Sequence, residues 1–364
     1  MAIGMAWAVY FAQMPVIKAN VGASDAAYGI ALLIAAFGAL AAMWLAPAAR
    51  AALGSMAMPI SIAALACGMM AAGLSGGLLA LTLAMLLTSA ASGVIDVLVN
   101  ARVSEIEASS GRTLMNLNHA LYSFAYAGGA LATSALRSAD VPPLPIFACL
   151  AVVLAFLAIS ARDKVAPLED APTTENVGMP IGLVMLGGLT VLVAFTAEAV
   201  SEGWSALHIE RTLEGAPWQG ALGPAVVGLS MGIGRLFGHG LVRLMRDTTL
   251  MLIATLFAAA GLMITAFAQS APMGLVGFAI VGLGISVVAP LALALVGRRV
   301  PPEARLAAIS RVSVIGYGAF FFGPPAMGLM AEGFGLRTAF MTVSAVLALT
   351  ALVLIPALVR TNRR

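Results

Sequence analysis

The sequence predicts an all-α membrane protein whose twelve transmembrane helices form two six-helix bundles. The prediction follows from the composition, from the number of long apolar segments, and from one long polar stretch near mid-chain. Hydrophobic residues make up 61% of the 364 residues and charged residues only 10%, whereas soluble domains carry about 25% charged residues. A chain with so few charges cannot cover an ordinary surface in water, so the composition indicates an integral membrane protein.

Twelve apolar segments can be assigned to membrane spans, because a spanning helix needs about 20 mostly apolar residues. The predicted spans are 1–18, 26–47, 56–74, 77–103, 114–136, 144–161, 180–206, 217–243, 249–268, 272–298, 306–331 and 337–359. The first segment has no basic region before its apolar run, so we expect a spanning helix there and not a cleaved signal peptide.

The longest polar stretch, residues 162–179, leaves six segments on either side. It reads RDKVAPLEDAPTTENVGM, with six charges, two prolines and no apolar periodicity, which predicts a linker. The predicted organisation is an N-terminal bundle (1–161), this linker, and a C-terminal bundle with a short basic tail (180–364).

The distribution of basic residues predicts the orientation. With the N-terminus inside, thirteen of the 19 Lys and Arg residues are cytoplasmic: Arg50, Arg102, Arg112, Arg162, Lys164, Arg243, Arg246, Arg298, Arg299, Arg305, Arg360, Arg363 and Arg364. Four are on the outer side: Lys18, Arg137, Arg211 and Arg337. Because cytoplasmic loops carry an excess of Lys and Arg, both termini and the linker are predicted to be cytoplasmic.

Several functional classes have no support in the sequence. The net charge is only +3 without a basic block, which disfavours nucleic-acid binding. Cys67 and Cys149 stand alone and the three histidines are not clustered, so neither a disulfide, a metal nor a cofactor is predicted. No set of nucleophile, base and orienting residue is visible, so the chain is predicted not to be an enzyme.

Two carboxylates stand in the seventh span, in the stretch VLVAFTAEAVSEGWSALH. Glu198 and Glu202 are four residues apart, which places them on one helix face about one turn apart. A charge at this depth costs roughly 2.5–3.5 kcal/mol on insertion scales and is retained where it faces a polar cavity or carries protons or solute. Glu198 is predicted to be the proton-coupling carboxylate. Glu202 is predicted to contact the solute, with a solvated helix-end residue as the alternative.

Trp204 allows two interpretations, because it follows these carboxylates near the outer boundary. It is either an aromatic anchor at the membrane interface or a ring that stacks on the apolar face of a sugar-like solute. We include it among the predicted solute contacts, together with Gln13, which stands shortly before Pro15 in the first span.

The fourth and fifth spans carry a second polar group. Asp96 and Asn100 are four residues apart, and the fifth span has a polar stripe at 3-4-3 spacing, formed by Asn116, His119, Ser123 and Tyr126. The two spans meet at similar depth in the inner half. Asp96, Asn100 and His119 are therefore predicted to form one hydrogen-bonded cluster, with Asp96 and His119 assisting proton coupling.

Asn100, Ser123 and Tyr126 are predicted to contact the solute. The alternative is a structural role, in which these polar residues only form hydrogen bonds between neighbouring helices. Two arginines, Arg235 and Arg311, lie within the eighth and eleventh spans and are predicted to form structural ion pairs. Arg311 could pair with Asp96 or bind an anionic group, and Arg235 could cap the C-terminus of a neighbouring helix.

These local sequences resemble one branch of the major facilitator superfamily, the MosC-like or rhizopine-transport-like permeases. TAEAVSEGWSALHIE is similar to the branch's seventh-helix signature through Glu198 and Trp204–Leu207, and GVIDVLVNARVSEIEASSGR to its fourth helix through Asp96 and Asn100. His119 and Ser123 match its fifth helix. GRLFGHGLVR resembles the eighth helix, and VIGYGAFFFGPPAMGLMAE, which contains Tyr317, resembles the eleventh.

The chain departs from the superfamily in places that bear on gating. In the superfamily, acidic and basic residues in the loop after the second span usually act as a latch that helps hold one conformation. Here that loop reads LAPAARAALGS and carries only Arg50. After the eighth span, His239 stands where an acidic residue is expected. Without the latch, we expect the inner side to be held closed less firmly and the solute-free protein to rest open to the inside. Tyr10 and Gln13 stand where the branch has Trp and Arg.

The resemblance implies a secondary transporter that moves a small polar, sugar- or polyol-like solute by alternating access, driven by protons. Since no ATP-binding motif is present, transport must draw on a gradient. The alternative is a proton-driven exporter of amphipathic compounds, for which the 20 methionines would suit a pliable cavity. A non-transporting membrane sensor is a third possibility. The protein is expected to be a monomer in a bacterial inner membrane.

Overall fold

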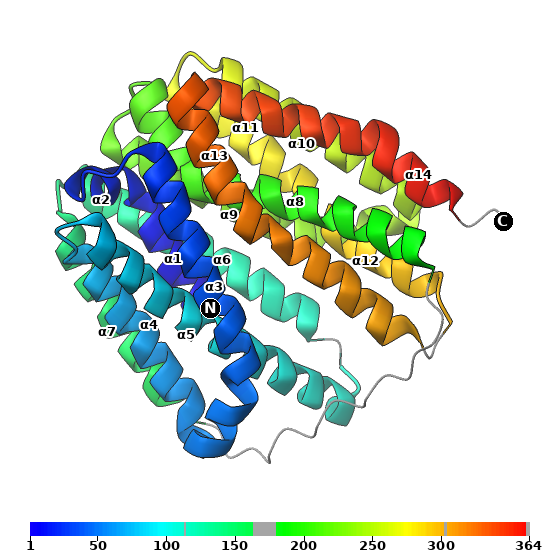
Figure 1. The fold of residues 1–364 in the computed structure, drawn as a ribbon, viewed down its shortest axis with the longest axis horizontal. Coiled ribbons are helices and arrows are strands. Elements are labelled where there is room, and N and C mark those ends of the chain that lie inside the picture. The colour runs from blue at the N-terminus through cyan, green and yellow to red at the C-terminus, as the bar shows by residue number, and fades with distance from the viewer. Residues whose placement is uncertain (113, 163–179, 302–303, 362–364) are drawn as a thin grey trace.

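The computed structural model describes residues 1–112, 114–162, 180–301 and 304–361, and all regular structure in these ranges is helical (Figure 1). The N-terminal half comprises α1 (Ala2–Ala12), α2 (Met14–Asn20), α3 (Asp25–Leu53), α4 (Ala57–Gly73), α5 (Leu78–Ser110), α6 (Met115–Ser138) and α7 (Pro143–Ser160). The C-terminal half comprises α8 (Ile181–Leu207), α9 (Pro217–Leu244), α10 (Asp247–Phe267), α11 (Ala271–Ile285), α12 (Val288–Arg298), α13 (Arg305–Leu349) and α14 (Ile355–Arg360). The predicted linker lies outside the described residues, apart from residue 162, and the side chain of His239 is not described.

In the described part of the chain, the helices make up twelve spans in two groups of six, as the sequence predicted. Eight stretches of that part are long and apolar enough to cross a membrane, and two of them, Asp25–Gly73 and Ala307–Arg360, each contain two consecutive spans. The remaining two spans are the first, which is short, and the fifth, where the polar stripe of α6 lowers the hydropathy.

Two spans depart from a regular helix at identifiable residues. The first is interrupted at Gln13 (φ −109°, ψ 1°), where α1 ends and α2 begins. Pro15 follows two residues later and has no backbone N–H to continue the helical hydrogen bonds. In α13 the eleventh and twelfth spans are joined at Gly335 (φ +82°), a backbone conformation that glycine adopts without steric cost.

Two helices run further than their apolar segments predicted. α3 continues past residue 47 to Leu53, and α5 continues past residue 103 to Ser110. The apolar length of a segment reports how much of it lies in lipid, whereas the helix ends where its backbone groups find other partners. Glu107 in the polar end of α5 accepts hydrogen bonds from the N–H groups of Leu114 and Met115 (2.7 Å to Met115) and so caps the start of α6.

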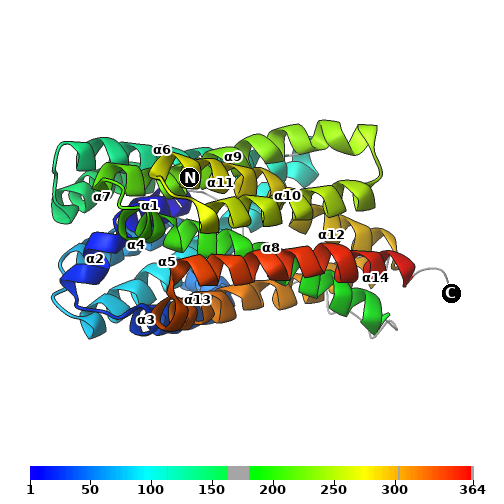
Figure 2. The same ribbon diagram turned by 90° about the horizontal axis from the view of Figure 1, so that it is seen from above.

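The two halves lie side by side and meet along two helix pairs, α6 with α9 and α3 with α13 (Figures 1 and 2). Glycines bring the backbones of α3 and α13 together. A Cβ atom on Gly29 would lie 2.6 Å from the carbonyl oxygen of Pro324, and one on Gly328 would lie 2.4 Å from that of Asp25. In Figure 1 the ribbons of the two halves are closest near α2 and diverge toward the ends of α5 and α12.

The substitution Gly29→Ala is expected to destabilise this contact between the halves. The added methyl group overlaps backbone atoms that cannot move aside, and overpacking of this kind costs about 1–3 kcal/mol. Gly128→Ala is the matched control, because a Cβ there meets no atom within 4 Å. Thermal unfolding in detergent should show a lower midpoint for Gly29→Ala only. Equal midpoints for the two variants would contradict the close approach of α3 and α13.

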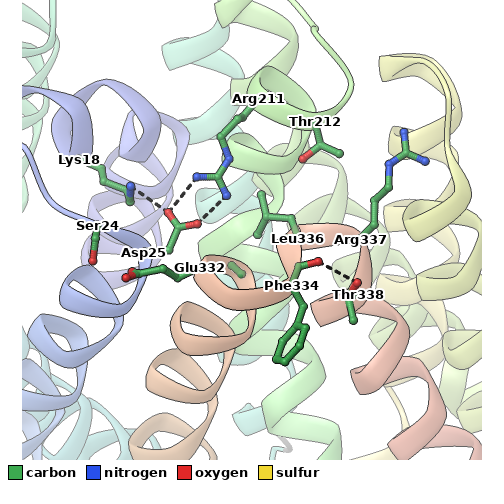
Figure 3. A pocket seen from close by; sticks show the side chains of 12 residues that line it. Lys18, Ser24, Asp25, Arg211, Thr212, Glu332, Phe334, Leu336, Arg337 and Thr338 are labelled. Carbon is green, nitrogen blue, oxygen red and sulfur yellow. Dashed lines mark hydrogen bonds and ion pairs between the residues drawn. The ribbon is translucent and has the colours of Figure 1, made fainter.

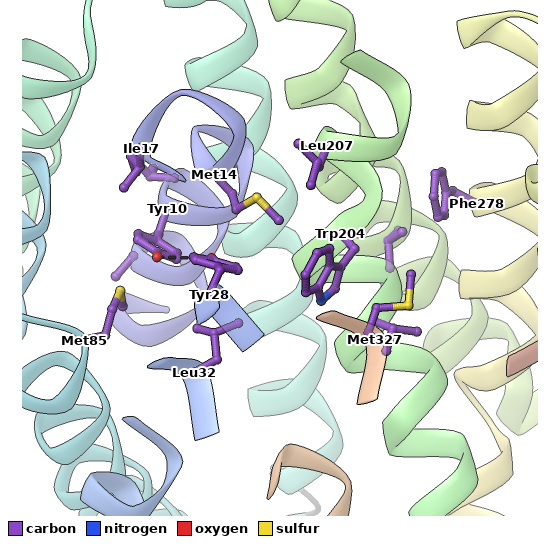
Figure 4. Close-up of a cluster of buried hydrophobic side chains, with 14 of the residues drawn as sticks. Tyr10, Met14, Ile17, Tyr28, Leu32, Met85, Trp204, Leu207, Phe278 and Met327 are labelled. Atoms are coloured by element: carbon purple, nitrogen blue, oxygen red, sulfur yellow. Dashed lines mark hydrogen bonds between the residues drawn. The ribbon is translucent and has the colours of Figure 1, made fainter. Parts of the chain in front are cut away.

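A buried apolar cluster lies across the boundary between the halves (Figure 4). Tyr10 and Tyr28 are joined through their hydroxyl groups (3.1 Å), and the ring of Tyr28 meets Trp204 of the other half edge to face, with centroids 5.8 Å apart. Trp204 is only 1% exposed, so its interpretation as an interfacial anchor is wrong. The other large apolar side chains with high exposure, among them Trp44, Val152 and Leu244, suit contact with lipid.

Candidate functional site

Three polar side chains from three helices meet where the halves touch. Arg235 on α9 donates through Nη1 to the hydroxyl of Ser123 on α6 (2.6 Å) and through Nη2 to Oε1 of Glu198 on α8 (3.3 Å). Since α6 belongs to the other half, Arg235 connects the carboxylate of its own half to the N-terminal half. Arg235 therefore forms the ion pair that the sequence predicted for it and does not cap a neighbouring helix.

Glycines on α9 allow α6 to approach this cluster. A Cβ atom on Gly232, one turn before Arg235, would lie 3.2 Å from the Cβ of Ser123, and one on Gly228 would lie 2.6 Å from the ring of Tyr126. Glycines interpreted from the sequence as helix-packing positions therefore bring the polar stripe of α6 against α9. The fifth-span residues Ser123 and Tyr126 are both buried as a result.

Glu202 lies one turn along α8 from Glu198 and is partly buried. Its charge acts on the hydroxyl groups of Tyr122 and Tyr126, whose rings lie 6.3 Å apart. In the part of the chain that the structure describes, Glu202 has no ion pair and the Tyr126 hydroxyl has no hydrogen-bond partner. Glu202 remains a predicted solute contact, and it places a second carboxylate one helical turn from the Glu198–Arg235 ion pair.

The predicted cluster of Asp96, Asn100 and His119 is assembled only in part. Asn100 lies one turn from Asp96 on α5, and its amide acts on the Asp96 carboxylate. His119 is exposed and makes no direct hydrogen bond to either residue among the described ones, and the charge that acts on it is that of Arg235. His119 lies one turn from Ser123 on α6, so it belongs to the Arg235 side of the site.

Asp96 nevertheless shares an electrostatic environment with the carboxylates of α8. The charges of Asp96 and Glu198 both act on the hydroxyl group of Tyr317 on α13, whose ring packs against Phe195 (centroids 5.8 Å apart). The pairing of Arg311 with Asp96 is not formed, because the Arg311 side chain is exposed and makes no ion pair with any described residue. The face of α13 that Arg311 occupies could not be known from the sequence.

Gln13 lies at the interruption between α1 and α2 and is completely buried. Its amide nitrogen donates to the carbonyl oxygen of Val9 (3.2 Å), while its Oε1 atom has no partner among the described residues. Gln13 and Trp204, both predicted solute contacts, are thus covered by protein in this conformation. A solute could reach either one only after the halves rearrange.

A set of charged residues that the sequence analysis missed joins the halves at one end of the molecule, which we call the ion-paired end. Arg211 makes a bidentate pair with Asp25 (2.9 and 2.6 Å) from the opposite half. Arg137 likewise pairs with Glu210 of the opposite half (2.6 and 3.2 Å). The sequence analysis counts Arg137 and Arg211 only as outer basic residues and assigns no role to Asp25 or Glu210, although acidic and basic residues of both halves lie at the same predicted end.

Backbone groups add further links between the halves at this end. The Ser134 hydroxyl donates to the carbonyl oxygen of Trp218 (2.8 Å), and Glu332 accepts from the N–H of Ala26 (2.8 Å) at the start of α3. An acidic side chain is favourable there because a helix N-terminus presents unpaired N–H groups. These contacts and the two ion pairs close the ion-paired end.

The position of Glu210 and Arg211 follows from a π-helical turn that continues α8. The turn spans His208–Thr212, and its wide hydrogen bond runs from the N–H of Leu213 to the carbonyl oxygen of His208 (3.1 Å). The buried ring of His208 holds the turn against the end of α10 through Thr265 (Nε2 to carbonyl oxygen 3.0 Å). Such turns are frequent at functional sites.

A pocket of about 690 Å³ opens beside the Asp25–Arg211 pair (Figure 3). The charged side chains that line it are Lys18, Asp25, Arg211, Glu332 and Arg337. At the opposite end of the molecule, two ion pairs lie within one half: Arg102 pairs with Glu105 (3.0 Å), and Arg298 pairs with Asp247. Ion pairs and charged hydrogen bonds link the two halves at the ion-paired end and around Arg235.

Comparison with known proteins identifies similar sequences over nearly the whole chain. A family model described as Major Facilitator Superfamily matches residues 188–364. The chain is 31% identical over 347 residues to an uncharacterized MFS-type transporter of Yersinia pestis, which covers 94% of this chain and 90% of the relative. It is 28% identical over 350 residues to the membrane protein MosC of Rhizobium meliloti, covering 94% and 84% of the two chains.

Solved structures share the fold at lower sequence identity. A mutant of the nucleoside transporter NupG is similar with a TM-score of 0.75 and 14% identity, over 99% of this chain and 97% of the other. At this identity the likeness concerns the arrangement of helices, which agrees with the twelve-span architecture described above.

Proposed function

Since the chain belongs to the major facilitator superfamily and is a membrane transporter rather than an enzyme, we propose that it moves a small polar, sugar- or polyol-like solute coupled to protons. The observation that carries the proposal is the contact of Arg235 with both Glu198 and Ser123. A titratable carboxylate is thereby connected to a contact between the two halves, which are the parts that move in alternating access.

Protonation of Glu198 removes the negative charge that holds the Arg235 guanidinium. Arg235 can then move away from Ser123, which releases one link between the halves. Loss of the proton restores the ion pair and the link. Coupling of this kind requires that the proton and the solute favour the same rearrangement, because a ligand shifts an equilibrium only through its different affinity for the two states.

The magnitudes are compatible with accumulation of a solute. One proton moving down a gradient of one pH unit supplies about 1.4 kcal/mol, and a tenfold concentration ratio costs about the same amount. A transporter that moves one proton with each solute molecule therefore reaches roughly tenfold accumulation under such a gradient, before any contribution from the membrane potential.

The solute site is assigned to the polar groups around this ion pair. Asn100, Ser123, Tyr126 and Glu202 supply hydroxyl, amide and carboxylate groups that suit the hydroxyl groups of a sugar or polyol. Asp96 on α5 and His119 on the Arg235 side of the site assist in proton transfer. The names of the relatives support the class in a general way, since the structural neighbour NupG is a nucleoside transporter and nucleosides contain a sugar.

The orientation follows from the excess of basic residues at the end that carries the linker and the C-terminal tail. With that end in the cytoplasm of a bacterial cell, the ion-paired end faces outward. The two cross-half ion pairs then hold the outer side closed, and the substrate-free monomer rests open to the inside. The stretch LAPAARAALGS, most of which forms the end of α3, has Arg50 as its single charged residue and supports the same resting state.

Uptake by purified protein in liposomes tests the proposal. Radiolabelled monosaccharides and polyols that raise the melting temperature in a thermal-shift screen are offered with and without an inward pH gradient, since ligands of the folded state raise its apparent stability. Accumulation only in the presence of the gradient is the expected result. Binding without transport would favour a sensor. Extrusion of amphipathic dyes without sugar uptake would favour the exporter.

A further inference from the structure

Two charged residues of the N-terminal half at the ion-paired end, Asp25 and Arg137, each have a second partner within their own half. Asp25 Oδ1 lies 2.9 Å from the Lys18 ammonium group while both carboxylate oxygens also bind Arg211. Arg137 Nη1 donates to the carbonyl oxygen of Ala12 (2.7 Å) as well as to Glu210. A latch that only held the halves together would need neither of these additional contacts.

We propose that Lys18 favours opening of the ion-paired end, by competing with Arg211 for the carboxylate of Asp25. Lys18 would then be a positioning residue of the transport cycle whose main contribution is made in the open state. The inference rests on the alternating access of the proposed function, but it concerns the equilibrium between two conformations of the protein without solute.

Two electrostatic effects give Lys18 this direction. In the closed state Lys18 and Arg211 approach the same carboxylate, so the two cations repel each other and the attraction of Arg211 is reduced. In the open state Arg211 leaves with the C-terminal half, and Lys18 remains beside Asp25. The free energy of the open state is lower when Asp25 keeps Lys18 as a partner than when a partly buried carboxylate is left unpaired.

Burial makes the second effect important. The Asp25 side chain is only 5% exposed and Lys18 is 12% exposed, whereas Arg211 is 43% exposed and faces the pocket (Figure 3). Water can therefore solvate Arg211 as it separates from Asp25. Asp25 lies deeper and gains more from a partner of its own half.

The remaining charged residues of the pocket are engaged with backbone groups and do not take over this role. Glu332 accepts from the N–H of Ala26, and Arg337 donates to the carbonyl oxygen of Ala266 at the end of α10 (3.4 Å). Competition for the Asp25 carboxylate therefore concerns Lys18 and Arg211. The carbonyl oxygen of Ala12, which the interruption at Gln13 frees from helical hydrogen bonding, gives Arg137 a partner within its own half, as Lys18 does for Asp25.

The test measures the distance between spin labels on the two sides of the ion-paired end. Labels are placed at Asn20 and Ser270, both exposed, after Cys67→Ser and Cys149→Ser remove the native thiols. Glu210→Gln serves as the background, because loss of the second ion pair brings the open state to a measurable population. Lys18→Met, Lys18→Arg and Arg211→Met are then compared in liposomes without solute.

Lys18→Met is expected to lower the ratio of long to short distances about tenfold, an effect of about 1.4 kcal/mol. Arg211→Met is expected to raise the ratio, and Lys18→Arg, which keeps the charge, should leave it near the background value. If Lys18→Met raises the ratio as Arg211→Met does, or leaves it unchanged, Lys18 does not favour opening and the proposal is wrong.

Thermal unfolding of each variant shows that the compared proteins are folded, and Lys18→Gln replaces Lys18→Met if the latter is not. A failure of solute uptake would leave this comparison intact and would count against the proposed function alone.

Discussion

Glu198→Gln is expected to abolish the accumulation of solute driven by a pH gradient while solute exchange continues. Glutamine keeps the shape of the side chain and can still accept a hydrogen bond from Arg235, but it cannot bind and release a proton. Under a gradient of one pH unit, the ratio of internal to external solute should fall from roughly tenfold to about one. The measurement is uptake of radiolabelled solute into liposomes, together with exchange of preloaded solute at equal pH.

Glu214→Gln is the matched control, because Glu214 is an exposed residue of the α8–α9 connection and carries the same chemical change. It should accumulate solute as the unmodified protein does. Glu202→Gln separates the two carboxylates of α8, since it should weaken solute binding and exchange. Continued accumulation by Glu198→Gln would mean that another group carries the proton, with Glu202 the first to examine.

Removal of both cross-half ion pairs by Asp25→Asn combined with Glu210→Gln is expected to open the ion-paired end. Each pair is partly buried and bidentate, so its loss should shift the equilibrium between closed and open states about tenfold or more, at about 1.4 kcal/mol per factor of ten. Ser205 on α8 is completely buried in the closed state. Ser205→Cys in a chain without its native cysteines should therefore react faster with a membrane-impermeant maleimide added from the outside.

Asp247→Asn provides the control, because it breaks an ion pair at the opposite end that stays within the C-terminal half. It should leave the outside labelling rate unchanged. If the double variant labels no faster than this control, the apolar cluster around Tyr28 and Trp204 holds the end closed without help from the charges.

The number of spans and their grouping could be predicted from the sequence because lipid imposes a local requirement. Each spanning helix must be apolar over nearly its whole length, so every span is visible in its own residues. Helix ends were predicted less well. The predicted span ends at residue 103, whereas α5 continues through two mostly polar turns to Ser110, and Glu107 in these turns caps the start of α6. The interruption at Gln13 is accompanied by Pro15 two residues later, a local signal that the predicted spans do not take into account.

The sequence predicted which residues belong to the candidate site better than it predicted which of them contact one another. Glu198 could be recognised because a carboxylate inside an apolar helix is costly wherever that helix lies. Its partner Arg235 was also recognised as a residue that must be paired. That Arg235 reaches Glu198 and Ser123, while Arg311 reaches no described acid, depends on the rotation of α9 and α13 about their axes. Contacts between helices set that rotation, and glycines such as Gly232 contribute to it.

The closed ion-paired end was decided by the tertiary structure alone. Asp25 and Arg211 are separated by 186 residues, and Arg137 and Glu210 by 73. The sequence determined that acidic and basic residues of both halves lie at one membrane face, because the apolar spans fix the depth of each loop. Which charges meet depends on how the halves pack, on the π-helical turn after α8 and on the interruption of the first span. A charge acts over a few ångströms in three dimensions, and the order of residues in a chain does not record such distances.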